Sequence, residues 1–153
     1  MADEVSIQER FFPDMACFGC GPGNPKGLQL RSYPAPDGSV VAQFMPWPEH
    51  NSGVGYLNGG IIATLLDCHS AAAVTLSAFE HGWTPLGDAP LAYVTSGLDV
   101  RYLRPSPLDE PVALRAVITA ADDAEMTSAV ELIWDGKPRA TATASWKRWR
   151  PRN

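Results

Sequence analysis

The sequence has few of the features that mark disulfide-stabilised, nucleic-acid-binding or disordered proteins. Only 3 of its 153 residues are cysteines, too few for a disulfide scaffold. Charged residues make up 19%, and the net charge of −5 has the wrong sign for neutralising phosphates, so we expect no nucleic-acid partner. Apolar residues make up 45%, which excludes a disordered chain. The length fits one domain rather than two.

Signals for export or membrane insertion are also missing. Residues 1–4 lack the basic and apolar regions of a signal peptide. The most apolar stretch, residues 61–79, carries Asp67 and His69 and falls short of a membrane span. We therefore expect a soluble cytoplasmic protein with no membrane partner. Four cations cluster near the C-terminus, and residues 149–153 are expected to form a solvated basic tail. These cations are Lys147, Arg148, Arg150 and Arg152.

Hydrophobic periodicity predicts an α+β domain. Apolar residues recur at helical spacing on most sides from residue 58 to about 79, so we expect a buried helix with Asn58 as its N-cap. The remaining segments alternate with period two, which predicts an antiparallel sheet with one face in the core. The expected strands are 28–33, 40–44, 98–103, 112–118, 129–134 and 140–147. Residues 1–27, rich in glycine and proline, are expected to form an irregular lead-in to one domain at 28–148.

Several common catalytic and cofactor motifs are absent from the sequence. It contains no GxxxxGK[ST] phosphate loop, no HExxH metal helix and no GxSxG nucleophile elbow. Cys17 and Cys20 form a CxxC pair, which suits half of a zinc site or a redox dithiol. A zinc site would need two further ligands from Cys68 and the three histidines, and a redox dithiol would need a thioredoxin-like βαβ unit. We expect two ordinary thiols, no metal and no cofactor.

The residues best suited to chemistry lie at the start and in the middle of the predicted helix. Gly59 and Gly60 open it, where backbone N–H groups are unpaired and carry partial positive charge. A carbonyl oxygen that gains negative charge can approach these groups closely at a glycine. Asp67 lies among apolar residues, so its carboxylate is either held by a structural hydrogen-bond network or kept for function. Residue types alone leave both roles open.

The spacing of Gly59 and Asp67 restricts how they can cooperate. They are eight residues apart in the sequence, which is about 12 Å along a helix. One reacting carbon cannot lie within bonding distance of both. If both act on one substrate, Asp67 must come from a second copy of the chain whose helix lies antiparallel to the first. A catalytic role for this pair therefore predicts a symmetric dimer with two composite sites.

Asn58-Gly59-Gly60 followed by Asp67 resembles the HGG…D motif of the PaaI-like acyl-CoA thioesterases, a family with the hotdog fold. Other segments similar to this family are CFGCG at 17–21, NPKGL at 24–28 and VRYLRP at 100–105. The resemblance spans residues 17–148. It implies a curved antiparallel sheet of about six strands wrapped around one long central helix. It also implies hydrolysis of an acyl-CoA substrate by a homodimer or a dimer of dimers.

The resemblance also implies roles for individual residues. The Gly59 N–H would donate a hydrogen bond to the oxyanion, with Gly60 beside it as a substrate-binding position. Asp67 of the other subunit would be the general base or the nucleophile. Thr95 falls where members often carry a hydroxyl that helps to position water.

The loop before the predicted helix and the residue at position 58 correspond to two functional parts of the family pattern. The loop that holds His50, Asn51 and Ser52 often lends a polar side chain to the thioester carbonyl in the family. Asn58 stands where most members have His. Its amide can cap the helix and donate a hydrogen bond, but it cannot change charge near neutral pH as His can. Oxyanion binding through the neighbouring N–H survives this replacement, whereas a proton-transfer role of the His does not.

Two other functions stay open at this stage. A non-catalytic acyl-CoA-binding protein of the same fold is the alternative that Asn58 favours. A hydratase acting on CoA esters would need an Asp/His pair, but His69 lies about 200° around the helix from Asp67, and we expect it to be a satisfied core residue. The loop at 80–92, with Trp83, Pro85 and Leu86, is expected either to line an acyl tunnel or only to connect two elements.

Overall fold

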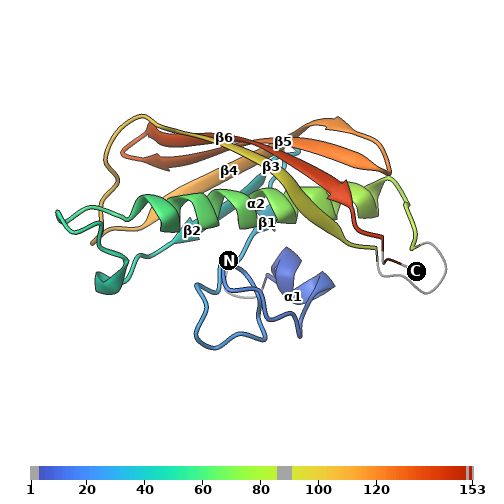
Figure 1. Ribbon diagram of the computed structural model, residues 1–153, viewed down its shortest axis with the longest axis horizontal. Helices are drawn as coiled ribbons and strands as arrows, with labels where there is room; N and C mark the ends of the chain where they lie inside the picture. The colour runs from blue at the N-terminus through green and yellow to red at the C-terminus, as the bar shows by residue number, and fades with distance from the viewer. Residues whose placement is uncertain (1–3, 86–90, 151, 153) are drawn as a thin grey trace.

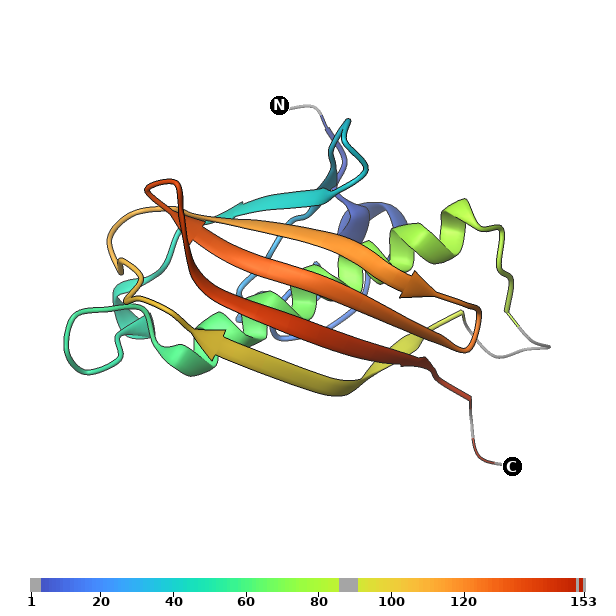
Figure 2. The ribbon, with the colours of Figure 1, turned by 90° about the horizontal axis from the view of Figure 1, so that it is seen from above.

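In the computed structural model, one long helix lies under a curved six-stranded antiparallel sheet (Figure 1). The structure describes residues 4–85, 91–150 and 152. Its elements are α1 (Ile7–Phe11), β1 (Tyr33–Pro34), β2 (Val40–Phe44), the 3₁₀ turn η1 (Pro48–His50), α2 (Gly59–Glu80), β3 (Tyr93–Tyr102), β4 (Val112–Ala121), β5 (Glu125–Trp134) and β6 (Lys137–Arg148). The strand order β1-β2-β4-β5-β6-β3 leaves β1 and β3 at the two edges, as Figure 2 shows from above.

The predicted order of two strands, one helix and four strands is confirmed. The helix begins one residue after Asn58, which caps it as expected. β3 begins at Tyr93, five residues before the predicted strand. Its first half escaped the period-two pattern because Ser96 and Gly97 interrupt the alternation, and the pairing with β6 shifts register between Thr95 and Gly97.

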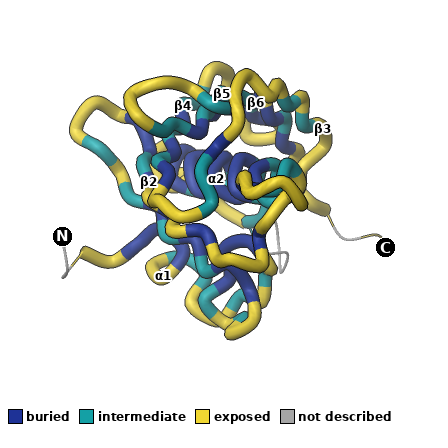
Figure 3. Tube along the Cα trace, turned by 90° about the vertical axis from the view of Figure 1, so that its left-hand side faces the viewer, coloured by how far each residue is buried: buried dark blue, intermediate teal, exposed yellow. Residues whose placement is uncertain are grey.

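The core lies between α2 and the sheet, and the lead-in covers the opposite side of the helix (Figures 1 and 3). Leu65 and Leu66 of α2 are fully buried. The helix and the last strand both contribute small side chains to this core, which lets the sheet approach closely and curve around α2. These side chains are Ala72, Ala73 and Ala78 of α2 and Ala140, Ala142 and Ala144 of β6.

The sequence expectation that the apolar stretch falls short of a membrane span needs correction. α2 has 22 residues, and its most apolar window reaches a mean hydropathy of 1.5, so length and composition alone would allow it to cross a bilayer. In the structure, 61% of that window is buried inside the fold. The apolar surface of α2 is therefore covered by the protein itself, as in a core helix.

The expectation that residues 1–27 are wholly irregular is wrong, because this segment contains α1. Ser6 caps the helix with a capping box, in which its hydroxyl accepts from the Glu9 N–H at 3.1 Å. The Glu9 carboxylate in turn accepts from the Ser6 N–H at 3.0 Å. The sequence Ser6-Ile7-Gln8-Glu9 carries this capping-box signal.

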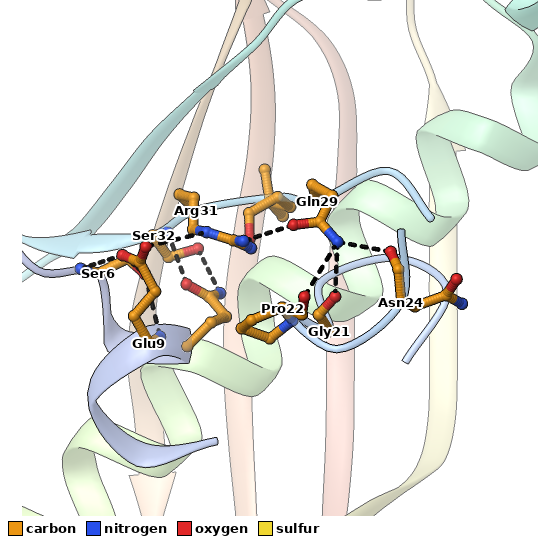
Figure 4. A network of polar contacts seen from close by, with 10 residues as sticks. Ser6, Glu9, Gly21, Pro22, Asn24, Gln29, Arg31 and Ser32 are labelled. Carbon is orange, nitrogen blue, oxygen red and sulfur yellow. Dashed lines mark hydrogen bonds and ion pairs between the residues drawn. The ribbon is translucent and has the colours of Figure 1, made fainter. Parts of the chain in front are cut away.

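The strand expected at 28–33 is also wrong, because the sheet begins only at Tyr33. Leu28 and Leu30 are buried in alternation, but their N–H groups donate to Phe18 and Gly19 of the lead-in instead of to a strand. Between them, Gln29 has a φ of 58°, which no extended strand allows. Its side-chain amide donates to the Gly21 carbonyl at 3.0 Å and to the Asn24 carbonyl at 2.5 Å (Figure 4). This segment therefore ties the lead-in to the domain.

The predicted basic tail is shorter than its cluster of cations suggested. Lys147 and Arg148 belong to β6. The Arg148 guanidinium donates to the Thr84 carbonyl at 2.6 Å and is mostly buried, while the Lys147 ammonium lies 3.8 Å from the Glu125 carboxylate. Among residues 149–153, Arg150 and Arg152 are exposed in the part that the structure describes.

Candidate active site

The start of α2 presents one unpaired backbone N–H. The Asn58 side-chain oxygen accepts from the N–H groups of Gly60 at 2.7 Å and Ile61 at 3.2 Å. No acceptor within residues 4–85, 91–150 and 152 bonds to the Gly59 N–H. The Tyr102 hydroxyl donates to the Gly59 carbonyl at 2.7 Å and so holds the Gly59–Gly60 peptide, which adjoins the peptide that carries the Gly59 N–H. The Gly59 N–H is thus positioned and available to an external acceptor.

The loop before α2 holds the helix start from the other side. The Asn58 N–H donates to the His50 carbonyl at 2.8 Å. The His50 ring is buried, stacks on Trp47 at a centroid distance of 4.6 Å and accepts from the Trp47 N–H through Nδ1 at 3.0 Å. Burial lowers the pKa of His50 below its ordinary value, so the neutral ring is favoured. In this structure His50 positions Asn58 through its backbone.

Asp67 lies at mid-helix, partly buried, and carries a side-chain hydrogen bond to a neighbouring strand. The Thr95 hydroxyl of β3 donates to the Asp67 carboxylate at 2.7 Å. Burial raises the pKa of Asp67, the Thr95 hydrogen bond opposes this rise, and Cys17 adds to it. A carboxylate whose pKa is raised toward neutrality is a better proton acceptor for general base catalysis.

A cavity of about 700 Å³ opens beside Asp67 and Thr95. Its wall is mainly apolar and comes from the lead-in, from α2 and from the segment before β3. The aromatic residues in this wall are Phe11, Phe12, Phe79, Trp83, Tyr93 and Trp146. Trp83 confirms that the 80–92 loop contributes to the wall, whereas Leu86 lies outside the described residues. The cavity offers space for an apolar chain next to a carboxylate.

Only some of the predicted site residues come together within a single chain. Asp67 and Thr95 are in contact, but Asn58, Gly59 and Gly60 are not part of the cavity wall. The Gly60 N–H, at the position expected to bind substrate, donates to the Asn58 side chain at 2.7 Å. Ser52 lies in an exposed loop, where its N–H donates to the Tyr56 carbonyl at 2.8 Å. Tyr102, whose hydroxyl contacts Gly59, was not among the predicted site residues.

His69 is confirmed as a satisfied core residue. Its Nε2 lies 2.8 Å from the Val40 carbonyl, which can only accept, so Nε2 carries the proton. Its Nδ1 then accepts from the Ser32 hydroxyl at 2.9 Å. Burial lowers the pKa of His69 to about 4. Both ring nitrogens are therefore occupied, and the Asp/His pair of a hydratase is not formed.

Comparison with known families decides what kind of protein carries this site. The pattern of the thioesterase superfamily matches residues 54–141, more than half of the chain. The chain belongs to the thioesterase superfamily. The matched region of this thioesterase includes the start of α2, Asp67 and β3. A search of curated proteins finds no match.

Solved structures similar to this thioesterase share its architecture. A phenylacetic acid degradation-related protein of Ralstonia eutropha JMP134 is 22% identical, with a TM-score of 0.70 over 93% of this chain and 98% of that chain. A Bacillus halodurans protein solved with CoA is 24% identical, with a TM-score of 0.65 over 82% and 77% of the two chains. The Escherichia coli PaaI protein is 18% identical, with a TM-score of 0.64 over 80% and 81%. The predicted PaaI-like hotdog fold is confirmed.

Proposed function

We propose that this thioesterase hydrolyses acyl-CoA thioesters at two equivalent sites, each shared between two copies of the chain. The apolar cavity beside Asp67 is suited to an acyl chain. CoA as the thiol component is supported by the Bacillus halodurans neighbour that was solved with CoA.

The separation of two functional groups on α2 carries this proposal. The free Gly59 N–H lies at the first residue of the helix, and Asp67 lies eight residues further along it. An unbroken helix holds them about 12 Å apart. The cavity wall includes Asp67 but not the helix start. A substrate that uses both groups must therefore receive one of them from another subunit.

The exposed edge of the sheet supports the contribution of that group by a second subunit. Within the described residues, β3 pairs with β6 on one side only, and its ten residues leave a long unpaired edge. Val94 is 46% exposed and Tyr102 is 55% exposed on this strand. Such an edge is a template for pairing with another strand.

An antiparallel pair of β3 strands would bring the two groups together. Thr95 near one end of β3 contacts Asp67, and Tyr102 at the other end contacts Gly59. A two-fold axis between residues 98 and 99 pairs Thr95 with Tyr102 of the partner subunit. Each Asp67 would then face Gly59 of the partner subunit, and two composite sites would result.

In the proposed reaction, the thioester carbonyl oxygen accepts from the Gly59 N–H, which stabilises the negative charge that develops there. Asp67 from the partner either takes a proton from the water that attacks the carbonyl carbon, or attacks that carbon itself. The carbon–sulfur bond then breaks, and the CoA thiolate leaves and is protonated. In the second route, water hydrolyses the acyl–aspartate anhydride and regenerates the carboxylate. Thr95 orients Asp67 in either route.

Steady-state hydrolysis of a panel of acyl-CoAs tests this proposal. Asp67→Asn keeps the shape of the side chain and its bond from Thr95 but removes the base, so kcat should fall by about 10²–10⁴-fold. Asp109→Asn makes the same chemical change at an exposed residue outside the cavity wall and should leave kcat unchanged. An Asp67→Asn enzyme with wild-type kcat would refute the assignment.

A non-catalytic acyl-CoA-binding protein is the second candidate, and Asn58 is the observation that favours it. Its side-chain oxygen is occupied by the Gly60 and Ile61 N–H groups, so the residue serves as a cap and has no titratable proton. Binding of acyl-CoAs by calorimetry, without turnover of any member of the panel, would support this candidate over the enzyme.

A further inference from the structure

The lead-in and α2 bring three cysteine side chains together beside the cavity. Cys17 and Cys20 come from the CxxC segment, and Cys68 follows Asp67 on α2. The three sulfur atoms all lie within 4.8 Å of one another, and the Cys17 and Cys68 sulfurs are 3.7 Å apart. All three are free thiols. We expected two ordinary thiols because the sequence named Cys68 only as one of several possible further ligands and did not place it beside the CxxC pair.

The backbone of the lead-in is shaped for this approach. A Cβ atom at Gly19 would collide with the Cys68 sulfur, so only glycine lets the segment lie against α2 at this point. The next turn is closed by the Gly21 N–H, which donates to the Cys17 carbonyl at 2.8 Å. The Leu30 N–H then donates to the Gly19 carbonyl at 3.0 Å and holds the segment in place. The sulfur cluster is therefore held by several fixed contacts.

Sulfur geometry distinguishes the uses that such a cluster could have. A tetrahedral zinc site with Zn–S bonds of about 2.3 Å separates its sulfur ligands by about 3.8 Å, close to the Cys17–Cys68 distance. A disulfide joins two sulfurs and would leave the third without a role.

We propose that Cys17, Cys20 and Cys68 bind one thiophilic cation of the Zn²⁺ class. Three thiolates match the soft-ligand preference of such ions. Because all three cysteines line the cavity, the fourth coordination position would face it and be open to water or another small ligand. The ion would lie beside Asp67, in the cavity wall rather than in the sheet.

Titration of the reduced full-length protein with Co²⁺, under exclusion of oxygen, tests this site without any substrate. We expect one Co²⁺ per chain, a thiolate-to-cobalt charge-transfer absorption, and displacement of Co²⁺ by Zn²⁺. Cys17→Ser changes a partly exposed side chain and should weaken binding by more than about 100-fold, since loss of an outer partner alone costs 10–100-fold. Cys68→Ala should have the same effect through the ligand on α2.

A matched control separates this site from adventitious binding. His81→Asn removes an exposed potential ligand outside the cluster and should leave both the absorption and the stoichiometry unchanged. Circular dichroism of each variant checks that it is folded, and the variant at the partly exposed Cys17 provides the test if the Cys68 variant unfolds. Absence of the charge-transfer absorption in the wild-type protein, or equal binding by folded Cys17→Ser, would overturn the proposal. Neither result depends on thioester hydrolysis.

Discussion

Asp67 and His69 lie two residues apart on the same helix, and the protein uses their burial in opposite ways. Both His69 ring nitrogens are bonded within the chain, to Ser32 and to the Val40 carbonyl. Within the described part of the chain, Asp67 receives one side-chain hydrogen bond, from Thr95 on an exposed edge strand, and it faces a cavity. Burial favours the neutral form of both groups. What distinguishes the catalytic candidate is therefore an open partner position, and not burial or a shifted pKa.

On the Asp67 side of this comparison, the largest effect on activity is expected from a change at Gly59, the first residue of α2. Gly59→Pro removes the free N–H at a helix position that tolerates proline, and Asn58 already has the extended ψ of 134° that proline requires before it. Removal of one oxyanion donor should lower kcat by about 10²–10³-fold with little change in stability. Steady-state kinetics and thermal unfolding of the same preparation check both parts.

Gly59→Ala is the control for that variant. It keeps the N–H, and the added Cβ would lie 3.5 Å from the Tyr102 ring, an ordinary contact. If the alanine and proline enzymes were equally slow, the loss would come from crowding and not from the missing donor.

A large effect on stability is expected on the His69 side as pH falls. The pKa of His69 is about 4 in the fold against 6.5 in the unfolded chain, so the unfolded state takes up the proton first. Stability contributed by the neutral ring is complete above pH 6.5 and is lost as pH falls toward 4, by ~3 kcal/mol in total. Urea unfolding of chelator-treated protein across this range measures the loss.

His69→Gln should be less stable at neutral pH but should lack this part of the pH dependence. Identical pH profiles for wild-type protein and His69→Gln would show that His69 is not a buried neutral residue.

A smaller effect of opposite sign is expected for the stability of the Asp67 variant. Because burial raises the pKa of Asp67, its charged form weakens the fold at neutral pH. Asp67→Asn removes that cost and can still accept from Thr95, so its free energy of unfolding should equal or exceed that of the wild-type protein at pH 7. Urea unfolding measures the difference, and a clear loss of stability would place Asp67 with His69 as a structural residue.

Local sequence patterns predicted the helix and the strands whose formation depends on residues close together in the sequence. Hydrophobic period and the cap at Asn58 predicted α2 almost to the residue. The strand patterns predicted all five longer strands, with β3 predicted only in its second half. Segment 28–32 was misread because burial alternates there, while its backbone bonds to the lead-in. α1 is too short for periodicity to detect, although its capping box was readable at Ser6 and Glu9.

The candidate site was likewise predictable only where it depends on local sequence. The spacing of Gly59 and Asp67 was readable because both lie on one helix of known rise. Contacts between distant segments were not readable, since they depend on how the chain packs. The Tyr102 bond to Gly59 and the approach of Cys17 to Cys68 both join residues more than 40 positions apart.

The central claim is that each site combines Gly59 of one subunit with Asp67 of the other, and mixed dimers test it most directly. Chains carrying Gly59→Pro and chains carrying Asp67→Asn, each with its own affinity tag, are coexpressed and the mixed dimer is isolated by both tags. In a shared-site dimer one site is intact and the other has lost both groups, so we predict about half of the wild-type kcat per dimer. A mixed dimer as inactive as the two parent homodimers would contradict the account, because it would place both groups of each site on one chain.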